Sequence, residues 1–483
     1  MQSKRDQVQA HLFVMGRLAT GMLRGEPDAP DAPTGRTSRG MTTGIIIAAL
    51  ACLIAAVYGI VVPGGATAWK KPGTLVLVKE SGARYLYLDG ALHPLLNETT
   101  ARLIAGDQLT VDQVSANSLA DTPRGAPLGI LGAPDGLPGP DRLATAPWLA
   151  CAALRPGPSG DRRPQLALAI DPATHGTALT DNQGLLVTAP DGTTHLLWHG
   201  RRLRLDTRNG ARQALGQSAA TARPVTQAFL NALPAGPDLA APDTDQRGTP
   251  GPDLATKPTR VGQLFTGPNG DPYLLTTAGL TPLTTMAFEL LRNDQRTQQS
   301  AYQNAAVTPV AVGAGDLAAH SAPPAPAAQA GALPTAPPDL LTAPQGRDVC
   351  AELRPGDPAP TTAVTLVDDT AVQGPAPTAQ PGIEPACATA DTIAVRPGGG
   401  ALVRALSTAG TGTTLYLVTD NGVKYPLASP AVAKQLGYGE TAPAGLPGPL
   451  LTLLPTGPSL DPAALTGAAA PAAADPQAPA CTR

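Results

Sequence analysis

Residues 83–106, "ARYLYLDGALHPLLNETTARLIAG", decide the fold of this chain because their pattern returns near its other end. They are typical of two short strands joined by a turn at Asp89-Gly90 and followed by a helix. Residues 415–439, "LYLVTDNGVKYPLASPAVAKQLGYG", contain the same alternating strand, the same glycine turn and an aromatic-Pro-Leu triplet at the same offset from that glycine. The chain therefore contains one small folding unit at least twice.

The same unit can be traced four times along the chain. The copies occupy residues 72–115, 176–235, 260–296 and 400–455. Each predicts two strands around a glycine turn, a second glycine turn, a short third strand and a helix that covers one face of the small sheet. The glycines of the second turn are unevenly spaced, at Gly90, Gly200, Gly279 and Gly422. A solenoid keeps a fixed period, so we expect separate modules carried by another domain.

The composition also favours several small units over one large core. Glycine and proline account for 52 and 54 of 483 residues, and aromatic residues for only 3 %. Such a chain is expected to consist of small folded units separated by turns and linkers. Residues 307–346 and 463–483 are rich in alanine and proline and are expected to form a linker and a tail. The net charge of −3 gives no sign of a nucleic-acid partner.

Residues 44–62, "GIIIAALACLIAAVYGIVV", carry no charge. As a helix they would span roughly 28 Å, close to the thickness of a bilayer core. A buried core helix would have a polar face, and a signal peptide would start closer to the N-terminus, so we expect one transmembrane helix. The basic residues on its two sides are balanced and leave its orientation open.

The cysteines indicate on which side of the membrane the long C-terminal region lies. Four of the five cysteines follow the span, and none belongs to a Cys-x-x-Cys motif. That pattern is typical of disulfides in an oxidising compartment. We therefore expect residues 1–43 to be cytoplasmic and the C-terminal region to be extracytoplasmic.

Cys151 and Cys350 lie in short apolar strands without repeat character, in residues 143–175 and 347–396. Their pairing would join the two ends of the insert that carries copies two and three. It would close a loop of about 200 residues and contribute up to roughly 5 kcal/mol. The sequence thus predicts an α+β protein with four repeat modules around a disulfide-stapled central β domain. A second disulfide is expected between Cys387 and Cys481.

Residues 3–24 predict an amphipathic helix with an apolar seam. The seam comprises Val8, Leu12, Met15, Ala19 and Met22. These residues recur at spacings of three and four and share one helix face, yet the segment brings no domain against which to bury them. The helix is expected to dock on another protein or to lie on the inner membrane surface. Residues 25–40 are proline-containing and are expected to be a spacer between this helix and the membrane.

Several segments of the sequence resemble proteins of the EccB family, which are membrane components of the type VII (ESX-type) secretion system. They are "SKRDQVQAHLFVMGRL" at residues 3–18, the span near residue 50, "LVLVKESGARYLYLDGALHPLLN" at residues 75–97 and "PLGILGAPDGLPGP" at residues 127–140. The resemblance covers nearly the whole chain in order. It implies an elongated extracytoplasmic region that assembles with EccC-, EccD- and EccE-type membrane subunits. The sequence leaves self-association of the chain open. The resemblance also implies the ATP hydrolysis that has been ascribed to EccB.

No catalytic, cofactor-binding or metal-binding residues are predicted from the sequence. The chain contains no Gly-Lys dipeptide and hence no G-x-x-x-x-G-K-[ST] phosphate loop, and it contains no G-x-S-x-G elbow. The glycines at 398–400 precede a strand, whereas a phosphate site needs a helix N-terminus. His195 and His199 are four apart but belong to an alternating strand pattern, so the sequence predicts no metal site there.

The sequence leaves three functions open. The first is a structural and assembly subunit of a type VII secretion membrane complex. The alternatives are a membrane-anchored extracytoplasmic module that binds cell-wall polymer, and a weak ATPase. The amphipathic helix favours the first function, because a module that only binds polymer outside the cell has no need of a docking helix inside it.

Overall fold

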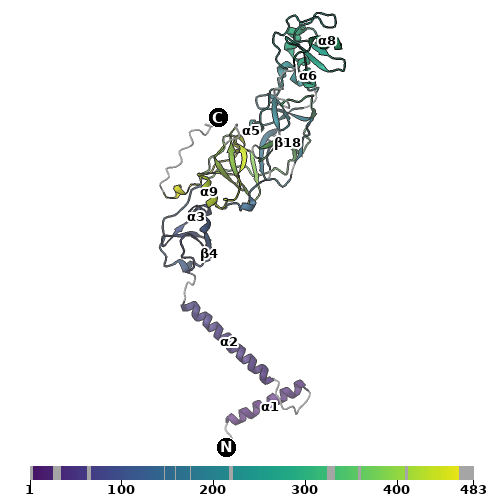
Figure 1. The fold of residues 1–483 in the computed structure, drawn as a ribbon. Coiled ribbons are helices and arrows are strands. Elements are labelled where there is room, and N and C mark those ends of the chain that lie inside the picture. Colours follow the sequence, from purple (N-terminus) through teal and green to yellow (C-terminus); the bar gives the residue numbers. More distant parts are fainter. Residues whose placement is uncertain are drawn as a thin grey trace. The chain divides into compact units, whose positions relative to one another are not determined.

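The structure is a computed structural model. It describes residues 4–24, 34–61, 67–145, 147–157, 159–174, 176–216, 221–323, 332–356, 360–407 and 412–466. Figure 1 gives the order of the elements along the chain. The chain forms two compact units. The first consists of Met1–Pro94 and Thr110–Gly125, and the second of Leu95–Leu109 and Ala126–Arg483.

The first unit contains two long helices and the sheet of repeat 1. Its elements are α1 (Lys4–Arg24), α2 (Thr34–Val61), β1 (Thr74–Val78), β2 (Arg84–Leu88), β3 (Ala91–Pro94) and β4 (Thr110–Val114). The spacer expected at residues 25–40 is wrong in its last part, because α2 already begins at Thr34. The residues between Thr34 and the apolar stretch include no proline, so the helix can continue through them without a break.

The other three repeats lie in the second unit. Repeat 2 contains β8 (Gln183–Thr188), β9 (Thr194–Trp198), β10 (Arg201–Arg204) and β11 (Arg223–Pro224); repeat 3 contains β12 (Leu264–Thr266), β13 (Pro272–Thr276), β14 (Gly279–Pro282) and β15 (Val310–Ala311); repeat 4 contains β20 (Gly400–Leu406), β21 (Leu415–Thr419), β22 (Lys424–Leu427) and β23 (Ala444–Pro447). In all four sheets three strands form an antiparallel meander, and a fourth strand lies parallel to the first. The four predicted repeats are confirmed, and the fourth strand is an addition that the sequence analysis did not predict.

Helices connect the third strand to the fourth in every repeat, as a parallel strand pair requires. They are α3 (Glu98–Ala105), α4 (Ala211–Ala214), α6 (Thr285–Asn293) with α7 (Gln295–Ala301), and α9 (Pro430–Gln435). Three more short helices follow fourth strands: α5 (Gln227–Ala232), α8 (Ala314–His320) and α10 (Gly448–Leu451). Short 3-10 helices occur at η1 (Gly106–Gln108), η2 (Ala116–Leu119), η3 (Pro140–Arg142), η4 (Thr207–Asn209) and η5 (Pro462–Thr466).

A closing segment runs parallel to the third strand of each repeat. In repeats 1, 2 and 4 it contains the sequence Pro-x-Gly, at residues 123–125, 234–236 and 455–457. In repeat 4 the Gly457 N–H donates to the Lys424 carbonyl at 2.8 Å. A Cβ atom at Gly457 would overlap the buried ring of Tyr425. Glycine is therefore required here, and the sequence analysis missed this recurrent motif.

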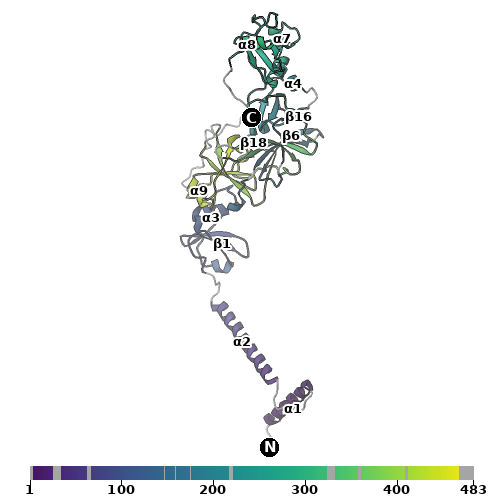
Figure 2. The same ribbon diagram turned by 45° about the vertical axis from the view of Figure 1, so that its right-hand side comes forward.

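The central domain is one sheet with the strand order β19-β6-β5-β17-β18-β7, in which β6 and β18 can be followed in Figure 2. Its strands are β5 (Trp148–Pro156), β6 (Arg162–Ile170), β7 (Thr177–Ala178), β17 (Arg347–Arg354), β18 (Thr361–Asp368) and β19 (Thr392–Val395). Cys151 and Cys350 face each other on β5 and β17 and form a disulfide. The expected disulfide-stapled central domain is thus confirmed.

Only one of the two cysteines expected in the second disulfide lies among the described residues. Cys387 is disulfide-bonded, but Cys481 lies outside the described residues. The pairing of these two cysteines therefore stays a prediction. Cys52, within α2, is a free cysteine.

The linker expected at residues 307–346 contains regular structure in its described parts. Its first part forms β15 and α8, where Val310, Val312 and Leu317 belong to one apolar cluster with Phe265. Near its end, β16 (Asp339–Leu341) pairs with β8 of repeat 2. The alanine- and proline-rich composition concealed these elements because only a few apolar residues carry the packing.

The tail expected at residues 463–483 also begins with regular structure, since η5 includes residues 463–466. Ala464 and Leu465 of this turn pack against the core of repeat 4. The rest of the expected tail lies outside the described residues.

Candidate functional site: helix α1 and the central junction

Helix α1 presents its predicted seam to solvent. The exposed fractions are 59 % for Val8, 66 % for Leu12, 55 % for Met15 and 82 % for Met22, and Ala19 is exposed as well. The sequence analysis missed Leu18, which lies beside the seam on the helical wheel and is also exposed. The structure thus brings the seam residues onto one continuous helix with their apolar side chains uncovered.

Helix α2 is long and apolar enough to cross a membrane, over Thr37–Tyr58. None of this stretch is buried within the described parts of the chain. It begins before the span expected at residues 44–62, and its first turn includes the charged residue Arg39.

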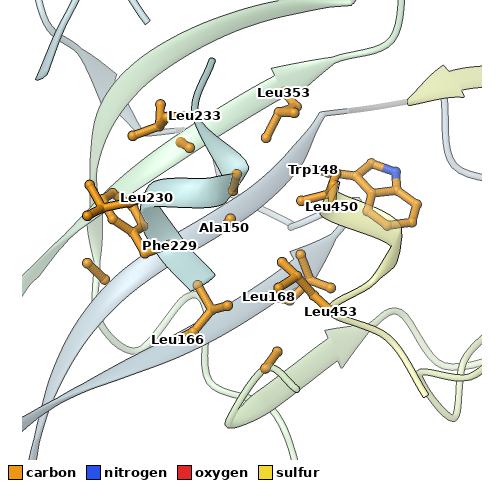
Figure 3. Close-up of a cluster of buried hydrophobic side chains, with 14 of the residues drawn as sticks. Trp148, Ala150, Leu166, Leu168, Phe229, Leu230, Leu233, Leu353, Leu450 and Leu453 are labelled. Atoms are coloured by element: carbon orange, nitrogen blue, oxygen red, sulfur yellow. The ribbon is translucent and has the colours of Figure 1, made fainter. Parts of the chain in front are cut away.

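The central junction is the apolar cluster on one face of the central sheet. Figure 3 shows α5 of repeat 2, with Phe229 and Leu230, lying over the strand residues Ala150, Leu166 and Leu168. The segment that contains α10 of repeat 4 reaches the same cluster. Its members there are Leu450, Leu451, Leu453 and Leu454, and α10 also contacts α5. Repeats 2 and 4 therefore dock side by side on one face of the central sheet.

The opposite face of the central sheet holds the disulfide. Cys151 and Cys350 belong there to a smaller cluster with Leu149, Val367 and Val372. The disulfide fixes β5 to β17, and these two strands also carry Trp148 and Leu353 of the central junction. The face of the central sheet on which repeats 2 and 4 dock is thus built on two strands that the disulfide joins covalently.

A buried ion pair network joins repeat 2 to the central sheet. Asp348 of β17 lies 2.9 Å from the Arg223 guanidinium of β11 and 3.0 Å from that of Arg155 on β5. Arg223 also donates to the Ala152 carbonyl at 3.0 Å. Burial raises the pKa of the Asp348 carboxyl and lowers the pKa of Arg223, while the attraction between the two opposes both shifts. Such a buried ion pair adds little net stability, because the cost of desolvating the charges offsets their attraction.

The crossover helices within the second unit pack against one another in pairs. α4 of repeat 2 packs against α6 of repeat 3, in a cluster that includes Ala214 and Leu290. α3, which follows the third strand of repeat 1, packs against α9 of repeat 4, in a cluster that includes Leu103 and Val432. The helices thus connect repeat 2 with repeat 3, and the helix of repeat 1 with repeat 4.

The two histidines do not converge on a common site. His195 lies on β9, where burial lowers the pKa of its imidazole. The ring of His199 stacks on Trp198, and its Nε2 lies 3.1 Å from the Asp181 carbonyl oxygen. Among the described residues no group of three or more His, Cys, Asp or Glu side chains could hold a metal ion.

The comparisons with known proteins agree with this architecture. The family model described as "Type VII secretion system ESX-1, transport TM domain B", the EccB model, matches residues 1–471. The chain is 27 % identical to the "ESX-2 secretion system ATPase EccB2" of Mycobacterium tuberculosis (strain ATCC 25618 / H37Rv), over 95 % of this chain and 93 % of that one. It is 28 % identical to the "ESX-3 secretion system ATPase EccB3" of Mycolicibacterium smegmatis, over 60 % of this chain and 57 % of that one.

Solved structures show the same fold. A chain of an intact ESX-5 inner membrane complex is similar with a TM-score of 0.63 and 23 % identity, over 96 % of this chain and 95 % of that chain. A structure of an EccB3 dimer from the ESX-3 core complex has a TM-score of 0.63 and 25 % identity, over 81 % of this chain and 99 % of that chain. The family model spans almost the whole sequence, and the chain belongs to the EccB family of the type VII secretion system.

Proposed function

We propose that this chain is a structural and assembly subunit of a type VII protein secretion membrane complex. The observation that carries the proposal is the exposed apolar seam of α1, which is followed along the chain by a helix that can cross a membrane. Exposed apolar residues in such a row mark an interaction surface. Membership of the EccB family supports the proposal, because relatives of similar fold occur in ESX inner membrane complexes.

The partners that fit best are the other membrane subunits of the same complex and a second copy of the chain. EccC-, EccD- and EccE-type subunits are proposed from the family resemblance. A second copy is proposed because a relative with 25 % identity has been solved as a dimer. Both curated relatives described above carry the word ATPase in their names. This sequence has no phosphate-loop motif, and hydrolysis is not part of the proposal.

The proposed topology places α1 in the cytoplasm and the repeats outside it. In a Cys52→Ala background, a cysteine reagent that cannot cross membranes should label Lys257→Cys, at an exposed position just before repeat 3, in intact cells. It should not label Gln9→Cys, at an exposed position of α1, until the cells are opened. Labelling of Gln9→Cys in intact cells would contradict this topology and place α1 outside the cytoplasm.

The functional proposal is tested by deleting the gene that encodes this chain from its native strain. Export of the proteins that depend on the same secretion system is expected to stop, and expression of the full chain in that strain should restore it. A control protein that leaves the cell by the general secretory route should be unaffected. Normal export of the dependent proteins in the deletion strain would contradict the proposal.

A further inference from the structure

Two basic residues occupy the same position in the two repeats that dock on the central sheet. They are Arg202 in repeat 2 and Lys424 in repeat 4. Each lies on the third strand of its repeat, opposite the closing segment. The Arg202 N–H donates to the Pro234 carbonyl at 3.0 Å, and the Lys424 N–H donates to the Pro455 carbonyl at 3.0 Å. The two residues are therefore structural equivalents.

The Lys424 side chain reaches the end of α10. Its ammonium donates to the Leu451 carbonyl at 2.7 Å and to the Leu454 carbonyl at 2.9 Å. Lys424 is only 8 % exposed, and burial lowers its pKa to about 8. Leu451 is the last residue of α10, and its carbonyl also accepts the Leu454 N–H at 3.3 Å, whereas Leu454 lies three residues beyond the helix. The lysine thus ties the third strand of repeat 4 to the segment that inserts Leu451 and Leu454 into the central junction.

Arg202 makes the corresponding contact in repeat 2. Its guanidinium Nε donates at 3.3 Å to the carbonyl of Leu233, the residue that follows α5. Leu233 is itself a buried member of the central junction. The same position therefore supplies a cation to the same kind of acceptor in both docked repeats.

Repeats 1 and 3 have leucine at the equivalent position. Leu92 pairs with the closing segment of repeat 1, where its N–H donates to the Pro123 carbonyl at 2.8 Å. Leu280 is bridged to Ser321 in repeat 3. Both leucines are fully buried in the core of their own repeat. Neither repeat contributes a residue to the described central junction.

We infer that Arg202 and Lys424 are positioning residues that hold the docking helices α5 and α10 against the central sheet. A cation at this position selects a repeat for docking, and leucine keeps the side chain within the repeat. Removal of the cation takes the side-chain donor away from carbonyl oxygens of buried residues. The loss of these hydrogen bonds is unfavourable, so the docking segment should open more often while the sheet of the repeat stays closed.

The test is hydrogen exchange on the full chain in detergent, measured residue by residue or on short peptides. In Lys424→Met, which keeps the length of the side chain, amides of residues 452–454 should exchange about tenfold faster. Amides of β21, in the same repeat, should keep their rates. In Arg202→Met, amides of residues 230–233 should accelerate, whereas those of β9 should not.

Matched controls separate positioning from a general loss of stability. Lys434→Met and Arg201→Met remove exposed cations from the same two repeats and should leave all these rates unchanged. Unchanged exchange at the docking segments in both variants would overturn the inference. Equal acceleration of the docking segment and the sheet strand would also overturn it, because the residue would then only stabilise its own repeat. If one variant fails to fold, the other decides the question.

Discussion

Replacing both Leu12 and Met15 by aspartate is expected to release this chain from its complex and to stop export. Both side chains lie on the exposed seam of α1. A partner that buries the seam would have to desolvate two unpaired carboxylates, at several kcal/mol for each. Because 1.4 kcal/mol is a factor of ten, recovery with partner subunits should fall by more than about a hundredfold. Quantitative mass spectrometry of the tagged chain purified from membranes measures this loss.

The control places two aspartates elsewhere on the same helix. Gln9 and Gly16 are one heptad apart on a different side of α1, and a Cβ at Gly16 would meet nothing within 4 Å. The variant with Gln9→Asp and Gly16→Asp carries the same added charge outside the seam. It should therefore assemble and support export normally. Normal assembly of the Leu12→Asp, Met15→Asp variant would show that the seam is not a docking element. Loss of assembly in both variants would show that added charge anywhere on α1 prevents assembly, and that the seam has no special role.

Replacing Gly457 by valine is expected to lower the free energy of unfolding by about 3 kcal/mol. The new side chain would overlap the ring of Tyr425, which is 1 % exposed and cannot move into solvent. The segment cannot retreat either, because the Gly457 N–H donates to the Lys424 carbonyl. Thermal or urea unfolding of the full chain in detergent measures the change.

Gly136→Val is the matched control for this prediction. A Cβ at Gly136 would meet nothing within 4 Å, and its φ is not in the left-handed region. That variant should therefore unfold like the parent chain. Equal stability of Gly457→Val and Gly136→Val would show that the closing segment does not pack against the ring as tightly as the structure requires.

The repeats and the central disulfide could be predicted because their signals are local. Leu86 and Leu88 alternate over a short strand, and the glycine turns recur with recognisable triplets. The two cysteines lie within continuous apolar strands, and they bracket an insert of repeat character. Period, turn chemistry and cysteine spacing were sufficient for these features.

The fourth strands could not be predicted because they pair at long range and two of them are very short. β11 and β15 consist of two residues each, too few for any periodicity to be visible. Their partners lie before the crossover helices. The recurrent Pro-x-Gly marks the closing segments of repeats 1, 2 and 4, which pair with the third strands, and gives no signal for the fourth strands.

The central junction was also outside the reach of pattern analysis. α5 has six residues and α10 has four, so neither contains enough turns to display an apolar face. The seam of α1 could be predicted because its residues recur over several turns of one helix.

The central claim is that this chain is an assembly subunit, and purification of the tagged chain from gently solubilised membranes tests it most directly. The account predicts one large particle in which the chain is recovered with EccC-, EccD- and EccE-type subunits in fixed proportions by quantitative mass spectrometry. Recovery of the chain alone, or only with copies of itself, under conditions that keep the other subunits together would contradict the account.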